Sequence, residues 1–71
     1  MNQDKDYNLY LLAELTYKSE HKDIEEDILF PTNWYSINNY KLKIEIIDEA
    51  LEKNIYIKDT KSYQKLLEGN K

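Results

Sequence analysis

The sequence predicts an all-α fold, a small bundle of three or four helices joined by short loops, in a single domain that spans residues 1–71. Apolar residues recur at spacings of three and four along two long segments, which is the pattern of helices with one buried face. The chain contains one Pro and one Gly, so residues that break helices are sparse. A length of 71 residues leaves room for one small core. We expect only residues 1–5 and 69–71 to be frayed.

The first predicted helix runs from about Tyr7 to Glu20. Asp6 or Asn8 can cap it, because either side chain can accept a hydrogen bond from a free amide of the first turn. A broad apolar stripe marks the expected core side of this helix and is formed by Leu9, Leu11, Leu12, Ala13 and Leu15.

The second predicted helix is shorter and covers Asp23 to Leu29. Asp23 followed by Glu26 resembles a capping box, and the helix dipole favours acidic residues in a first turn. Pro31 disfavours helical geometry at Phe30, so this helix should end there. The segment 30–36 contains three aromatic rings, which can bury a large area in a small chain.

The clearest pattern predicts a third helix over residues 38–53. Its apolar seam recurs at alternating spacings of three and four, and is formed by Ile37, Tyr40, Ile44, Ile47 and Leu51, with Ile46 and Ala50 widening it. Ser36, Asn38 or Asn39 can cap the start, and Asn54 can provide a left-handed stop. Glu49 and Lys53 have the spacing of a stabilising ion pair. The seam is either part of the core or an interface with another chain.

A last short helix is predicted near the C-terminus. Residues 55–57 alternate weakly and could be extended. Asp59 or Thr60 then caps the helix, and Gly69 ends it. Its expected inner face consists of Tyr63, Leu66 and Leu67.

Composition excludes several classes of protein. There is no Cys, so disulfides, thiolate metal sites and thiol nucleophiles are ruled out. The longest apolar run, Leu9 to Ala13, is far shorter than the roughly twenty residues of a membrane span, so we expect a cytoplasmic protein. Residue types that are written with A/T-rich codons (Phe, Ile, Tyr, Met, Asn and Lys) supply nearly half of the chain, which indicates a low-GC bacterium or its phage.

The candidates for chemistry are weak, and we predict no catalytic residue, no metal site and no cofactor. His21 and Glu25 could share a cation on one helix, but Lys22 between them would repel it. A single His also excludes a site with two histidines within one chain. One Gly is too few for a phosphate-binding loop or a glycine-bracketed nucleophile. The sequence therefore predicts a protein that is not an enzyme.

Pairs of carboxylates three residues apart suggest one alternative function, that of a magnesium-dependent enzyme. The pairs Glu20/Asp23, Glu45/Asp48 and Glu49/Glu52 resemble the paired carboxylates of helical nucleotide pyrophosphatases. That resemblance implies magnesium-dependent hydrolysis of a nucleotide. Such a site needs carboxylates that converge on a cavity, whereas the acids of the third helix lie mostly away from its apolar seam, towards water.

Aromatic residues and charge favour a protein–protein interaction function. Nine aromatic residues, seven of them Tyr, form 13% of the chain, and Tyr and Trp are common anchors of interfaces. The expected interaction surface comprises Tyr10, Tyr17, Glu20, Asp23, Glu26, Asp27, Trp34, Tyr35 and Tyr56. The partner would be another protein or a second copy in a homodimer, and the role that of a regulator, inhibitor, adaptor or immunity-type protein.

Nucleic-acid binding is the alternative from another class. It would use the lysine-richer C-terminal half, with Lys41, Lys43, Lys58, Lys61 and Lys65 against phosphates. A net charge of −4 and the absence of Arg both oppose it, because phosphate and base recognition rely on positive charge and on the two-pronged guanidinium group.

Overall fold

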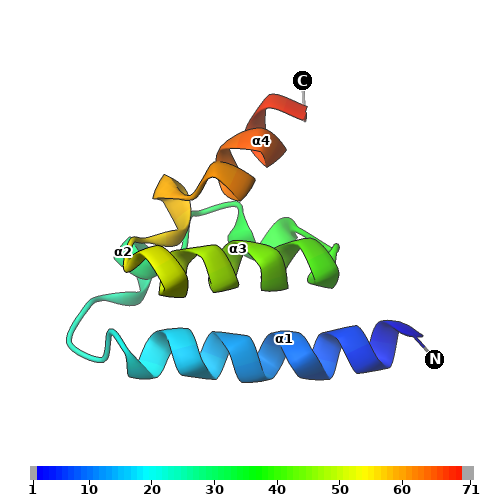
Figure 1. Ribbon diagram of the computed structural model, residues 1–71, viewed down its shortest axis with the longest axis horizontal. Helices are drawn as coiled ribbons and strands as arrows, with labels where there is room; N and C mark the ends of the chain where they lie inside the picture. Colours follow the sequence, from blue (N-terminus) through cyan, green and yellow to red (C-terminus); the bar gives the residue numbers. More distant parts are fainter. Residues whose placement is uncertain (1, 70–71) are drawn as a thin grey trace.

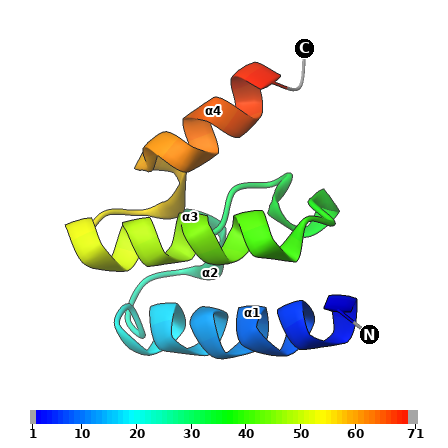
Figure 2. The same ribbon diagram turned by 45° about the vertical axis from the view of Figure 1, so that its right-hand side comes forward.

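Two long helices that run in the same direction form the base of the fold (Figure 1). The computed structural model describes residues 2–69. Helices α1 (Asn2–Ser19) and α3 (Tyr40–Lys53) lie side by side, and α4 (Lys61–Gly69) lies on the other side of α3 (Figures 1 and 2). The all-α class is confirmed, and within residues 2–69 every regular element is helical.

Because α1 and α3 are parallel, the chain must return to the starting end between them. Residues 20–39 make this return and contain α2 (Glu26–Leu29) and the 3₁₀ helix η1 (Trp34–Ser36). The sequence predicts helices joined by short loops, and this long crossing connection is the main difference. A second 3₁₀ helix, η2 (Ile57–Asp59), links α3 to α4. Of the segment 55–57 that could be extended, Tyr56 is extended and Ile57 already belongs to η2.

Helix α1 turns a different side towards the core from the one predicted. Tyr10 and Tyr17 are buried at 5% and 0% exposure, whereas the most exposed leucines of the stripe face away. The two tyrosines prevail because their hydroxyl groups find buried hydrogen-bond partners and their rings bury more area than leucines. The helix also begins earlier than expected, so residues 2–5 are helical and Asp6 and Asn8 lie inside it.

The second helix is shorter than predicted. Residues 20–24 form turns, and Glu25 stands at the N-cap position without a side-chain cap, so the capping box is not formed. The predicted stop is confirmed, because α2 ends at Leu29 and Phe30 is extended before Pro31.

Helix α3 follows the prediction closely at its ends. The side chain of Asn39 accepts a hydrogen bond from the Leu42 amide at 3.1 Å and caps the helix. Asn54 adopts φ 56° and ψ 49°, which confirms the left-handed stop. The seam belongs to the core of this chain, with Ile46, Ile47 and Ala50 fully buried.

Helix α4 is capped by Thr60, whose hydroxyl oxygen accepts a hydrogen bond from the Tyr63 amide at 3.1 Å. Tyr63 is buried and Leu66 is half-buried, as predicted, but Leu67 is 42% exposed and does not belong to the inner face. Gly69 is the last helical residue, whereas we expected it to be frayed. The remaining positions predicted to fray, residues 1, 70 and 71, lie outside the described residues.

Trp34 lies at the centre of the core and is fully buried. Its ring centroid is 5.9 Å from that of Phe30 and 6.3 Å from that of Tyr10, so the crossing connection packs aromatic rings against α1. Within the described residues, no helix combines the length and the apolar character needed to cross a membrane.

Candidate functional site

The outer side of α1 carries an exposed apolar stripe, which we call the α1 leucine face and define as Leu9, Leu12 and Leu15. These side chains are 47%, 62% and 62% exposed. At about 100° per residue they lie around the direction opposite to Tyr10 and Tyr17, the core side of the same helix. Figures 1 and 2 show α3 along one side of α1 and no other described helix along the opposite side.

Polar groups border the α1 leucine face at both ends. Lys5 and Asn8 are exposed near the start of the helix, and Thr16 and Glu20 are exposed near its end. The Thr16 hydroxyl donates a hydrogen bond to the Leu12 carbonyl at 3.0 Å, so its polar group is turned onto the helix backbone. The result is an apolar centre with a polar rim, which is the composition of a docking surface.

A hydrogen-bonded aromatic cluster fixes α1 from the other side. The Trp34 Nε1–H donates to the Tyr10 hydroxyl at 3.0 Å, and that hydroxyl donates to the Glu14 carboxylate at 2.5 Å. Burial and the bond to Glu14 raise the pKa of Tyr10 well above its usual value, so it is a neutral hydrogen-bond donor.

Lys43 of α3 is buried against this cluster. Its Nζ lies 4.7 Å from the ring centroid of Tyr10, 5.0 Å from that of Trp34 and 5.5 Å from that of Tyr40. Burial lowers the pKa of Lys43, and the nearby Glu14 carboxylate partly opposes this shift. Lys43 lines neither of the two hollows at the end of α1, so its contact with the three rings is a structural cation–π contact.

Tyr17 holds the other end of α1 to two separate loops. Its hydroxyl donates to the Leu29 carbonyl at 3.1 Å and accepts from the Ile57 amide at 3.3 Å. Together with Tyr10, it fixes the rotation of α1 about its own axis. These buried hydrogen bonds therefore turn the α1 leucine face outwards, because they fix which side of α1 faces the core.

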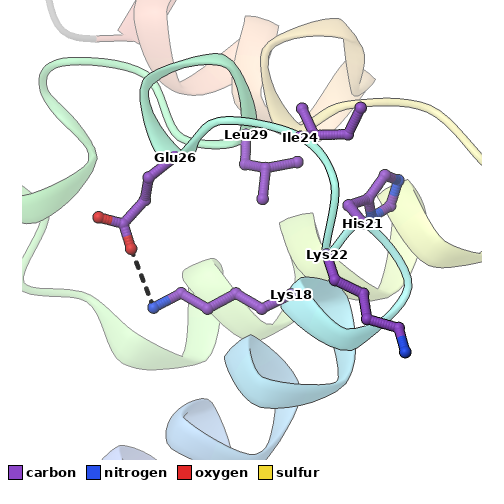
Figure 3. A pocket seen from close by; sticks show the side chains of 6 residues that line it. All are labelled: Lys18, His21, Lys22, Ile24, Glu26 and Leu29. Carbon is purple, nitrogen blue, oxygen red and sulfur yellow. Dashed lines mark ion pairs between the residues drawn. The ribbon is translucent and has the colours of Figure 1, made fainter.

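Two shallow hollows lie at the far end of α1. The first, of about 260 Å³, separates the end of α1 from α2, and the Lys18 Nζ pairs with Glu26 across it at 3.1 Å (Figure 3). Its lining is completed by Leu29, Ile24, His21 and Lys22. The amino group of Lys22 is directed outwards (Figure 3). The bond to Glu26 raises the pKa of Lys18.

The second hollow, of about 310 Å³, combines aromatic and acidic side chains. Glu26, Asp27 and Tyr35 line it together with Phe30, Pro31 and Thr32. Tyr35 is 61% exposed, and burial of its remaining surface, with the nearby Glu26, raises its pKa. Three residues of the predicted interaction surface are thus brought together.

The other predicted surface residues are scattered or buried. Tyr10, Tyr17 and Trp34 lie in the core, so the expectation that they form an exposed surface is corrected, because their polar atoms are used inside the protein. Glu20 and Asp23 are exposed in the turn after α1. Tyr56 is half-buried, with its ring centroid 5.7 Å from that of His21.

His21 lies in the turn before α2 and not on one helix with Glu25, as the cation hypothesis required. Its Nδ1 lies 2.9 Å from the Tyr17 carbonyl oxygen, which can only accept, so Nδ1 carries a proton. Across the described residues, no group of three His, Asp or Glu side chains converges in a way that could hold a metal ion.

Two residues on which the alternative functions depend, Glu49 for magnesium-dependent hydrolysis and Lys43 for nucleic-acid binding, are used inside the fold. Glu49 accepts hydrogen bonds from the Lys61 amide at 2.6 Å and from Ser62, so it caps α4 in place of facing a cavity. Lys43 is buried, so it is not available to a phosphate, whereas Lys41, Lys58, Lys61 and Lys65 are exposed.

No protein-family model matches the chain, and no curated protein or solved structure shows a significant match to it.

Sequence reasoning names all three residues of the α1 leucine face but assigns them to the core. The signal that could have placed them is the presence of two tyrosines, Tyr10 and Tyr17, seven residues apart on the other side of the same helix. A helix with apolar residues on two opposite sides can pack on the core through one side and leave the other exposed for contact with another molecule.

Proposed function

We propose that the protein is a small acidic interaction protein, acting as a regulator, inhibitor, adaptor or immunity-type protein, and that the α1 leucine face is its docking surface. The observation that supports the proposal is the exposure of three leucines at positions i, i+3 and i+6 on a helix whose opposite side is already packed. Single exposed leucines are ordinary, but an aligned set with a polar rim is typical of an interface.

The helix that carries these leucines is held in one orientation, and a surface on a preorganised backbone loses less entropy on binding. Tyr10 and Tyr17 fix the rotation of α1 through buried hydrogen bonds to Trp34, Leu29 and Ile57. Helix α1 therefore presents its leucines in one arrangement before any partner arrives, which favours binding.

The chemistry of the surface suits an apolar helix or groove as the partner. Spacings of three along α1 place the leucines along one oblique ridge, and a helix-in-groove contact is read through residues at such spacings.

The test is affinity capture from the native cell with three forms of the chain. We compare the original sequence, Leu12→Lys, and the control Leu67→Lys, which changes another exposed leucine outside the α1 leucine face. Circular dichroism first verifies that all three fold, as expected for changes at exposed positions. The proposal predicts a stoichiometric partner that Leu12→Lys loses at least ten-fold and Leu67→Lys retains. Equal capture by all three forms would contradict it.

A further inference from the structure

We infer that the α1 leucine face docks against the same face of a second copy of this chain, with the two α1 helices antiparallel and crossing at Leu12. This inference rests on the proposed docking role of the α1 leucine face and names its occupant. Because the same surface is used on both sides, the dimer is closed by a two-fold axis and does not grow further.

The leucines are arranged symmetrically about Leu12. Leu9 precedes it by three residues and Leu15 follows it by three, so the two lie about 60° to opposite sides of Leu12 around the helix. In an antiparallel pair, the Leu9 side chains of both copies lie towards one end of the two-fold axis and the Leu15 side chains of both copies lie towards the other. Leu12 then lies beside its own counterpart at the two-fold axis. Asn8 and Thr16, both exposed, lie just beyond the leucines along the helix and provide a polar edge.

Charge at the two ends favours the antiparallel arrangement. At about 1.5 Å per residue, Lys5 lies about 10 Å before Leu12 along the axis, and Glu20 lies about 12 Å after it. Glu20 keeps the helical spacing, because its amide donates to the Thr16 carbonyl at 3.1 Å. At about 100° per residue, Lys5 and Glu20 lie on the same side of Leu12 as Leu9 does.

A two-fold axis perpendicular to the helices brings equivalent sides together, so each Lys5 meets Glu20 of the other copy. A parallel pair would instead place Lys5 beside Lys5 and Glu20 beside Glu20. Both side chains are exposed and free to reach across a rim. Attraction between opposite charges thus favours the antiparallel pair, and repulsion between like charges disfavours the parallel pair.

The size of the surface limits the strength of the dimer. Three leucines that are half to two-thirds exposed are a small patch compared with the roughly 800 Å² per partner of a standard stable interface. We therefore expect a weak dimer that forms at high micromolar concentration and dissociates on dilution.

Sedimentation equilibrium measures the mass directly. The apparent mass of the original chain should rise from 8.6 kDa towards twice that value between low micromolar and millimolar concentrations. Leu12→Lys should remain at 8.6 kDa throughout, and Leu67→Lys should behave as the original chain does. A single mass of 8.6 kDa at every concentration would overturn the inference, and so would a dimer that Leu12→Lys leaves intact.

Two further variants test the arrangement. The chain has no Cys, so Leu12→Cys introduces a single thiol next to the axis, and mild oxidation should link two copies, whereas Leu67→Cys should stay unlinked. Lys5→Glu should weaken dimerisation several-fold, and adding Glu20→Lys should restore it. A double variant that stays as weak as Lys5→Glu would overturn the antiparallel pairing.

The outcomes separate this inference from the proposed function. If the chain is a monomer throughout but Leu12→Lys abolishes capture of another protein, the α1 leucine face is a docking surface for that protein and the homodimer is wrong. If the dimer forms through Leu12 and no other protein is captured, the inference stands.

Discussion

Replacement of Glu49 should lower stability more than replacement of an exposed carboxylate, because Glu49 joins α3 to the start of α4. Its two oxygens accept hydrogen bonds from the Lys61 amide at 2.6 Å, the Ser62 amide at 3.1 Å and the Ser62 hydroxyl at 2.8 Å. Lys53 adds an ion pair at 3.2 Å. These bonds lower the pKa of Glu49 to about 2.

The expected loss in the free energy of unfolding can be worked out because Glu49, a residue of α3, acts as an N-terminal cap of α4. Loss of a capping side chain costs about 0.5–2 kcal/mol, and a hydrogen bond to a charged group contributes about 1.5–3 kcal/mol. The side chain of Glu49 is 14% exposed, so solvent screens part of the interaction. We therefore expect Glu49→Gln to lower the free energy of unfolding by about 2 kcal/mol. For a domain of this size that corresponds to a melting temperature lower by roughly 8–16 °C.

The pH dependence provides an independent readout. The pKa of Glu49 is lower in the folded protein than its usual value of 4.5, so the ionised carboxylate stabilises the fold fully above that pH. The stabilisation is lost as the pH falls from 4.5 towards 2, where the group becomes protonated. The difference in stability between the original chain and Glu49→Gln should therefore shrink across this interval.

Thermal unfolding followed by circular dichroism measures both effects. Glu52→Gln is the matched control, because it removes the same charge from an exposed position on the same helix. It should change the melting temperature by only a few degrees. The reasoning is refuted if Glu49→Gln melts together with Glu52→Gln, or if the difference between Glu49→Gln and the original chain is the same at pH 7 and near pH 2.

Two further predictions concern the groups that orient α1. Tyr17→Phe leaves the Leu29 carbonyl and the Ile57 amide without their buried partner, so it should cost about 2 kcal/mol or more, measured by denaturant unfolding with the fluorescence of the one Trp. Tyr35→Phe, at an exposed ring, should cost less than about 0.5 kcal/mol, and equal losses would contradict the account. For Lys43, a titration followed by NMR should give a pKa below the usual 10.5 and below those of the exposed lysines, because burial disfavours its charge. A Lys43 that titrates with the exposed lysines would contradict its burial.

Local signals in the sequence predict the ends of elements well. Asn54 stops α3 in the left-handed conformation, and Pro31 ends α2, because both depend on the backbone chemistry of one or two residues. Asn39 and Thr60 similarly cap their helices through contacts within three residues. Such features need no knowledge of how the helices pack.

The rotation of α1 and the burial of Lys43 could not be predicted from spacing alone. Helix α1 is apolar on two sides, and only its contacts with Trp34 and the distant Ile57 select Tyr10 and Tyr17 for the core. Lys43 interrupts the apolar pattern of α3 but is stabilised by rings from two other segments. Both outcomes depend on residues far apart in sequence.

The central claim is that the α1 leucine face is occupied when the protein works. Photo-crosslinking in the native cell tests it most directly, with the photoreactive residue at position 12 in one form and at position 67 in the control. The account predicts a crosslinked band from position 12, to a second copy or to another protein, and none of comparable yield from position 67. Equal yields from both positions, or no crosslink from position 12, would contradict it.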